Sequence, residues 1–263
     1  VRALNRLGAT RSMEEFLRYI FNIASHDGSL QPLYGIGFED RLDEVEVPSL
    51  AGYRGMGPVR RGNLAWIQKQ HDVYGSVVLA STQLFFDQRL ADPGDAHTFA
   101  RLEPLGERAF ALYDVPDAGL WEFRGRAEVH TYTAAMCWAA CDRLAKIAAQ
   151  LGLQERVDYW RLRANTIRKT TLERAWRAEA NHFSASFQSD YLDASLLLLP
   201  AVAWTLAHLL ARFGRTVITN AERVDILMSA GGALWLLAAV GLTFLVLYLQ
   251  QAGMILVAAR PRD

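Results

Sequence analysis

The segment TYTAAMCWAACDRLAKIAAQ (131–150) is followed, after the tripeptide LGL, by QERVDYWRLRANTIRKTTLERAW (154–176). Apolar and small residues in both segments recur at alternating intervals of three and four, which is the spacing of one face of a helix. In the first segment these residues are Ala134, Trp138, Cys141, Ala145 and Ala148. In the second they are Val157, Trp160, Ala164, Ile167 and Thr171. The region therefore predicts two consecutive helices.

The same periodicity predicts three further helices towards the N-terminus. The first follows a capping-box pattern at Ser12 and Glu15 and ends near Gly28, which suits a left-handed turn. Its apolar stripe is Phe16, Leu17, Ile20, Ile23 and Ala24. A long helix is predicted from Asn63 to about Leu90 and closes at residues 92–95, and a shorter one runs from Pro104 to Tyr113. The stripe of the long helix is Leu64, Ile67, His71, Tyr74, Val78, Ser81 and Phe85. No alternating strand pattern precedes residue 200, so the sequence predicts an all-α domain.

Two long loops interrupt the helices, at residues 30–62 and 114–129. The first is rich in glycine and proline and also contains Tyr34, Tyr53, Arg54 and Arg60. Long loops in a compact domain are usually functional or disordered, and aromatic and arginine side chains favour the functional interpretation. We therefore expect the chemistry of the protein on these loops.

The charge balance and the cysteine content argue against a nucleic-acid-binding protein and against a metal site. The 28 Lys and Arg residues equal the 28 Asp and Glu residues, whereas a nucleic-acid-binding protein needs a basic surplus. Cys137 and Cys141 share a helical stripe with His130, but a structural zinc site needs four ligands. Buried core cysteines are the simpler interpretation, and we expect neither a metal nor an organic cofactor.

Glu122 is the candidate catalytic residue. Hydrolysis of a glycosidic bond needs two carboxyl groups, one of which donates a proton to the leaving oxygen. Trp121, directly before Glu122, can exclude water and favour the protonated form that a donor needs. A glutamate on a loop is more often only a solvated charge, so this neighbourhood alone does not decide the role.

Several motifs, read together in order, make the case specific. They are LQPLYGIG (30–37), LAGYRGMGPVRRGN (50–63), DVYG (72–75), GLWEFRG (119–125), HTYT (130–133), MCW (136–138) and LDASLLL (192–198). Over about residues 1–200 the chain resembles the bacterial branch of glycoside hydrolase family 15, the family of glucoamylases, trehalases and related α-glucosidases.

The resemblance implies a fold and a reaction. The fold is the (α/α)₆ toroid of the six-hairpin glycosidases, of which this chain would supply roughly half the helices. The reaction is hydrolysis of an α-glucosidic bond with inversion, with Glu122 as general acid. Trp121 would pack against the sugar, while the other substrate-binding side chains would be Tyr34, Tyr53, Arg54, Arg60 and Arg124.

Two departures from the family qualify this expectation. Phe123 stands where fungal members carry a second glutamate, so a disaccharide such as trehalose is a plausible substrate. The family's Trp-x-Arg-Asp motif would lie before Val1, and the motif of the base carboxylate is not found; Glu222 has the wrong surroundings for it. We therefore expect a chain truncated at its start and weakly active or inactive in isolation. The alternative is an inactive or sugar-binding, membrane-attached remnant of such an enzyme.

Residues 201–263 differ in character from the toroid fragment at 1–200. Residues 226–249 are an uncharged apolar run of 24 residues, long enough to cross a bilayer as a helix. A transmembrane anchor, a buried helix pair and the product of a reading-frame change remain three interpretations of this hydrophobic tail. No signal peptide is visible, so we expect residues 1–200 in the cytoplasm, with membrane attachment, if any, through the tail.

Overall fold

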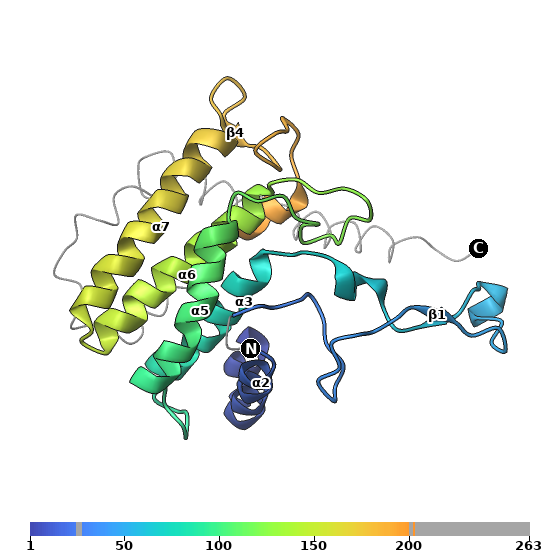
Figure 1. Cartoon of the computed structure of the whole chain (residues 1–263), viewed down its shortest axis with the longest axis horizontal. Helices are drawn as coiled ribbons and strands as arrows, with labels where there is room; N and C mark the ends of the chain where they lie inside the picture. The colour runs from blue at the N-terminus through green and yellow to red at the C-terminus, as the bar shows by residue number, and fades with distance from the viewer. Residues whose placement is uncertain (25–27, 200–201, 203–263) are drawn as a thin grey trace, which may run out of the picture. The chain divides into compact units, whose positions relative to one another are not determined.

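The computed structural model describes residues 1–24, 28–199 and 202 (Figure 1). Apart from Val202, the predicted tail lies outside these residues, and so do its apolar run 226–249 and Glu222. The end of the first predicted helix at residues 26–27 also lies outside them. In the part of the chain that is described, no helix is both long and apolar enough to cross a membrane.

Helices dominate the described residues, as predicted. The α-helices are α1 (Arg2–Arg6), α2 (Thr10–Ile23), α3 (Asp72–Ser81), α4 (Gln83–Phe86), α5 (Ala96–Leu112), α6 (Thr131–Gln150) and α7 (Gln154–Ala175). Short 3₁₀ helices are η1 (Tyr53–Gly55), η2 (Leu64–Ile67) and η3 (Ala194–Leu198). Two small antiparallel hairpins, which the sequence did not predict, pair β1 (Val45–Glu46) with β2 (Arg60–Arg61) and β3 (Trp176–Arg177) with β4 (His182–Phe183).

Helix α6 lies at the centre and packs against α3, α5 and α7 (Figure 1). Four of its five predicted stripe residues are buried, and Trp138 is partly buried. Residues outside that stripe, such as Ala139, Ala140 and Ile147, are fully buried as well. The buried residues thus lie on more than one face of α6, so neighbouring elements enclose the helix on several sides. Its many small side chains allow these neighbours to pack closely.

Helix α7 buries the face that the sequence predicts for it, and all five stripe residues are buried. Trp160 is completely inaccessible to solvent, and its indole Nε1 donates a hydrogen bond of 2.8 Å to Glu103 on α5. A buried indole N–H needs such an acceptor, so this contact ties α7 to α5.

Two glycines allow α6 to approach its neighbours closely. A Cβ atom at Gly75 on α3 would lie 2.2 Å from the carbonyl oxygen of Met136. At Gly106 on α5 it would lie 2.2 Å from Leu144 Cδ1 and 2.6 Å from the Trp160 ring. The backbones of α3 and α6 are therefore in contact at Gly75, whereas at Gly106 the space of a side chain is filled by Leu144 of α6 and Trp160 of α7.

The predicted long helix 63–90 is wrong. Asn63 caps the separate turn η2 by accepting a hydrogen bond from the Ala65 amide at 3.0 Å, and α3 begins only at Asp72. Between them, the Lys69 carbonyl accepts from the Ala118 amide and the His71 amide donates to Asp117. These bonds to a distant loop replace the bonds that a continuous helix would make. The predicted stripe is buried from His71 onwards, whereas Leu64 and Ile67 are exposed.

The predicted start of the next helix at Pro104 is also wrong. The carboxylate of Asp95 accepts hydrogen bonds from the amide and the hydroxyl of Thr98, both at 2.8 Å, so α5 begins at Ala96. Pro104 lies inside the helix. Asp95 therefore opens α5, although the sequence pattern assigned it to a closing turn.

At α2 the predicted capping box does not form. The helix begins at Thr10 without a side-chain cap, and Glu15 accepts instead from Arg11 Nε at 3.0 Å. The buried face is Met13, Leu17 and Phe21, so of the predicted stripe only Leu17 is buried. Gly28 has the expected left-handed conformation, with φ +71°.

Asp72, at the start of α3, is a buried carboxylate that is 5% exposed. Burial raises its pKa to about 6, although a backbone hydrogen bond lowers it. Its pKa in an unfolded chain is about 3.9. The folded protein therefore holds a proton between about pH 4 and pH 6 that the unfolded chain loses, so this group reduces stability as the pH rises through that window.

Asp72→Asn removes this ionisation and is expected to stabilise the protein at pH 8 by up to about 3 kcal/mol. The gain should shrink towards zero at pH 4.5, where Asp72 is protonated in the folded protein. Thermal unfolding of both proteins at the two pH values measures the difference. An equal shift of Tm at both would contradict the prediction.

Gly75→Ala is expected to lower the free energy of unfolding by about 2–3 kcal/mol, because the new methyl group meets the backbone of α6. Helix propensity alone predicts a gain of about 1 kcal/mol, so the sign of the change is diagnostic. Urea unfolding measures it. The control is Ser76→Ala at the exposed neighbouring position, where a change within about 0.5 kcal/mol is expected.

Candidate active site

The loop that carries Trp121 and Glu122 closes on itself just before α6. Asp117 and Glu128 form an antiparallel bridge with backbone hydrogen bonds of 3.0 and 3.1 Å. Inside the bridge, the Glu122 amide donates to the Gly119 carbonyl and the Phe123 amide donates to the Ala118 carbonyl, both at 3.1 Å. We call residues 117–128 the acid loop. Its tip is therefore a compact turn with internal hydrogen bonds.

Glu122 lies at the tip of the acid loop with an exposed side chain. Its backbone has φ +55°, a left-handed conformation that is uncommon for residues other than glycine. Gln68 Nε2 donates a hydrogen bond of 3.1 Å to its carbonyl oxygen. Among the described residues, no hydrogen bond or ion pair engages its carboxyl group, which is therefore accessible to a ligand.

Trp121 is anchored by its indole. Nε1 donates to both carboxylate oxygens of Asp193, at 3.0 and 3.1 Å. Asp193 also caps η3 by accepting from the Ser195 amide at 2.7 Å. Although partial burial raises the pKa of Asp193, the hydrogen bonds from Ser195 and Trp121 lower it below its ordinary value. The Trp121 ring remains 51% exposed and can offer a face to a sugar ring.

Arg60 and Arg124, which come from the two different loops, meet at one carboxylate. Glu44 forms ion pairs with Arg60 at 3.4 Å and with Arg124 at 3.2 Å. Arg60 also pairs with Glu46 at 3.2 Å. Two of the predicted substrate-binding residues are thus brought together, and one of them lies two residues from Glu122.

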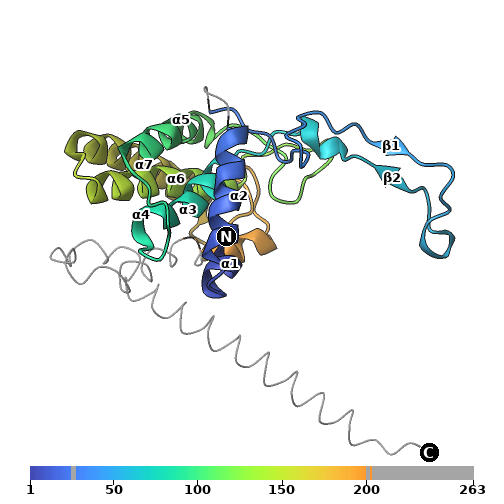
Figure 2. The ribbon, with the colours of Figure 1, turned by 90° about the horizontal axis from the view of Figure 1, so that it is seen from below.

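Tyr53 and Arg54 lie in η1, within the segment that connects β1 to β2, the two strands labelled in Figure 2. Tyr53 is 73% exposed, and the Arg54 guanidinium stacks 5.2 Å from the centre of its ring. Like Glu122, Arg54 has a left-handed backbone, with φ +53°. Within the described part of the chain, no hydrogen bond or ion pair connects this pair to the acid loop.

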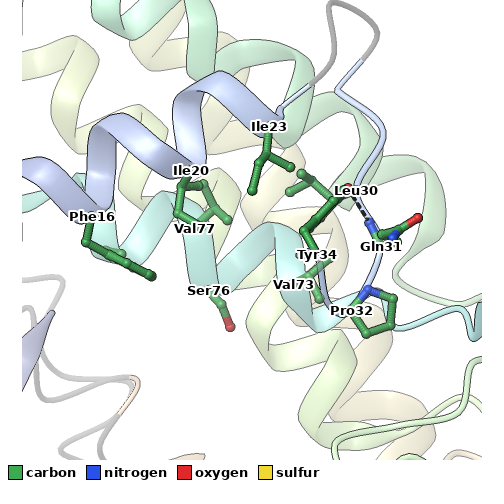
Figure 3. Close-up of a pocket in the computed structure, with 11 residues that line it drawn as sticks. Phe16, Ile20, Ile23, Leu30, Gln31, Pro32, Tyr34, Val73, Ser76 and Val77 are labelled. Atoms are coloured by element: carbon green, nitrogen blue, oxygen red, sulfur yellow. Dashed lines mark hydrogen bonds between the residues drawn. The ribbon is translucent and has the colours of Figure 1, made fainter. Parts of the chain in front are cut away.

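Tyr34 lines a separate apolar groove of about 320 Å³ between α2 and α3 (Figure 3). Phe16, Ile20 and Ile23 of the predicted α2 stripe line it as well. The Tyr34 hydroxyl accepts a hydrogen bond of 2.9 Å from the Gln31 amide, and burial raises its pKa. No carboxylate lines this groove, so it does not contain the acid–base chemistry.

His130, Cys137 and Cys141 of the predicted helical stripe are all buried. His130 is the N-cap residue of α6, and its ring packs against Gly119, where a Cβ atom would lie 2.6 Å from Nε2. Cys137 donates a weak hydrogen bond to the His71 carbonyl. Burial raises the pKa of both thiols, that of Cys141 to about 12, so they remain protonated core residues.

Sequence reasoning missed the groups that hold these side chains. Asp117, which is 1% exposed, lies in the second long loop (114–129), and its local sequence does not mark it as an anchor. Gln68 falls inside the predicted helix 63–90 and Glu44 inside the first long loop (30–62), so neither is predicted to hold a site residue. Asp193 lies in the motif LDASLLL (192–198), but nothing in the local sequence predicts its hydrogen bond with Trp121.

The model of glycosyl hydrolases family 15 matches residues 3–207. A trehalase of Mycobacterium tuberculosis is 35% identical over 200 residues, which is 74% of this chain and 29% of that protein. A trehalase of Thermoplasma volcanium is 30% identical over 208 residues, which is 79% of this chain and 33% of that protein. No solved structure matches.

The chain thus spans about a third of the length of the curated relatives it matches. The resemblance predicted from the motifs is confirmed, since the family model extends over most of the chain, including both long loops, 30–62 and 114–129. This chain belongs to glycosyl hydrolase family 15.

Proposed function

We propose that this chain supplies the general acid, Glu122, of a glycoside hydrolase that cleaves the α-glucosidic bond of trehalose with inversion. The observation that carries the proposal is an unpaired, exposed carboxyl group on a strained residue of an otherwise hydrogen-bonded loop. The relatives reported above are named trehalases, which favours trehalose over longer α-glucosides.

In this mechanism Glu122 donates its proton to the glycosidic oxygen as the bond breaks, and a second carboxylate activates water on the opposite face of the sugar. The left-handed conformation of Glu122 costs of order 1–3 kcal/mol, and such strain persists where the surroundings impose it. The hydrogen bonds from Gln68 and within the acid loop supply that constraint. The second carboxylate belongs, in this proposal, to a part of the enzyme outside this sequence.

The helical hairpin α6–α7 and the helices packed on α6 would form part of an (α/α)₆ toroid. In that arrangement the acid loop precedes an inner helix, and the end of the toroid that bears such loops forms the substrate site. The other predicted binding residues take the roles that the family resemblance implies. Trp121 packs on the sugar, while Tyr53, Arg54, Arg60 and Arg124 contact hydroxyl groups or stack on the ring. Tyr34 lines the separate groove between α2 and α3 and is given no contact with the reacting sugar.

Glu122→Gln is expected to lower kcat for trehalose by about 10²- to 10⁴-fold in the complete gene product that carries this chain. Hydrolysis of α-glucosyl fluoride should fall by less than about tenfold, because fluoride departs without a proton from the enzyme. Release of glucose and of fluoride measures the two rates. The matched control is Glu155→Gln at an exposed position of α7, which should leave both unchanged.

If Glu122→Gln slowed neither substrate, or both equally, Glu122 would not be the general acid. Trehalose binding without hydrolysis in the unsubstituted protein would favour the sugar-binding remnant instead. The anomer of glucose first released, followed by polarimetry, tests inversion separately.

Glu44→Gln is expected to raise KM for trehalose by about five- to tenfold with kcat within about twofold. The reason is that Glu44 holds both Arg60 and Arg124. Glu46 holds only Arg60, so Glu46→Gln is the matched control and should change KM less. Equal effects of the two substitutions would show that the shared contact to Arg124 does not matter for binding.

A further inference from the structure

We propose that Asp117 is the positioning residue of the acid loop, and that its buried carboxylate sets the direction in which Glu122 presents its carboxyl group. The inference rests on the proposed role of Glu122 and adds a residue that the motif comparison does not assign. Asp117 is buried, with only 1% of its surface exposed, so it would act on the position of the acid loop and not by touching a substrate.

The carboxylate of Asp117 connects three segments that are distant in sequence. Its Oδ2 accepts a hydrogen bond of 2.8 Å from the His71 amide at the start of α3. Its Oδ1 accepts one of 3.2 Å from the Gly119 amide inside the acid loop. The Thr133 hydroxyl, in the first turn of α6, lies 3.4 and 3.2 Å from the two oxygens. One side chain therefore joins the acid loop to the N-terminal ends of two core helices.

The backbone of the same residue closes the acid loop. Asp117 and Glu128 exchange two hydrogen bonds, and the neighbouring Ala118 amide donates to the Lys69 carbonyl at 2.8 Å. The next residue, Gly119, turns with φ +66° against the His130 ring. Glu122 follows three residues later, so the anchored residues 117–119 largely determine the position of its backbone.

The electrostatic surroundings disfavour the charged form of this buried carboxylate. The pKa of Asp117 is raised to about 7, chiefly by burial and also by the negative charge of Asp72, and the hydrogen bonds from His71, Thr133 and Gly119 only partly offset these effects. His130 Nε2 lies 3.9 Å from Oδ1, but burial lowers the pKa of that imidazole, so it adds little compensating charge. The buried thiol of Cys137 is also close enough to couple to this carboxylate.

The three hydrogen-bond partners of the Asp117 carboxylate, namely the His71 amide, the Gly119 amide and the Thr133 hydroxyl, all donate. The deprotonated carboxylate can accept from all three. An asparagine has only one acceptor oxygen and places an amide group against the remaining donors. Asp117→Asn therefore keeps the size of the side chain but breaks the three-way junction. This makes it a sharper probe than a truncation, which would also leave a cavity.

The test compares trehalose with α-glucosyl fluoride in Asp117→Asn and Glu122→Gln, in the complete gene product. A misplaced general acid should slow only the substrate that needs a proton. We expect kcat for trehalose to fall about 10²-fold, KM to stay within about twofold, and the rate on the fluoride to change less than about threefold. The matched control is Asp87→Asn, since Asp87 is another buried carboxylate but it binds Asn5 and Arg89. It should lower Tm without changing the ratio of the two rates.

An equal loss on both substrates, or no loss on either, would overturn the positioning role of Asp117. The two proposals fail separately. If Glu122→Gln does not discriminate between the substrates, the general-acid assignment itself is wrong. If Glu122→Gln discriminates and Asp117→Asn does not, only the positioning role falls.

A second measurement needs no activity and uses this chain alone. In Asp117→Asn, the amides of residues 118–123 should exchange hydrogen at least about tenfold faster than in the unsubstituted chain, which corresponds to about 1.4 kcal/mol. Exchange in α7 should stay unchanged. Unchanged exchange at 118–123, or equally increased exchange in both segments, would contradict the proposal.

Discussion

The close approach of α6 to its neighbours is the constraint on which the described structure depends. Small side chains on α6, together with Gly75 on α3, bring the backbones of α3 and α6 into contact, and Gly106 on α5 makes room for the side chains of Leu144 and Trp160. Dispersion and apolar burial are greatest in such tight contacts. Because α6 is held on several sides at once, its N-terminal end has a well-determined position, and the functional loops are attached there.

Three loop segments converge on that end of α6. The acid loop enters it directly through Val129 and His130, residues 184–187 bind it through the Thr131 amide and hydroxyl, and residues 69–72 reach it through Asp117. The helices thus supply the fixed contacts that anchor the acid loop, whereas Trp121 and Glu122 lie on the exposed surface of that loop. This division is common where catalytic groups sit on loops positioned by a stable scaffold.

The same region contains the features that are least favourable for stability. Asp72 and Asp117 are buried carboxylates with raised pKa values, and Glu122 has a strained backbone. Natural proteins depart from local rules mainly at functional sites, where the loss of stability is offset elsewhere. Asp72, Asp117 and Glu122 lie within and beside the acid loop, next to the closely packed core around α6 and α7, and the clustering of three such departures supports the proposed active site.

The sequence alone determined the helices at 131–150 and 154–175, the helical class and the family, as well as Glu122 as the candidate acid. Each of these depends on local periodicity or on motifs whose residues are close in sequence. Only the tertiary structure decided where the segment 63–90 breaks, which face of α2 is buried and which groups hold Trp121 and Glu122. Those outcomes depend on contacts such as His71 with Asp117, 46 residues apart, and Trp121 with Asp193, 72 residues apart. No local sequence pattern predicts such contacts, because a hydrogen bond between residues distant in sequence forms only after the helices between them have packed.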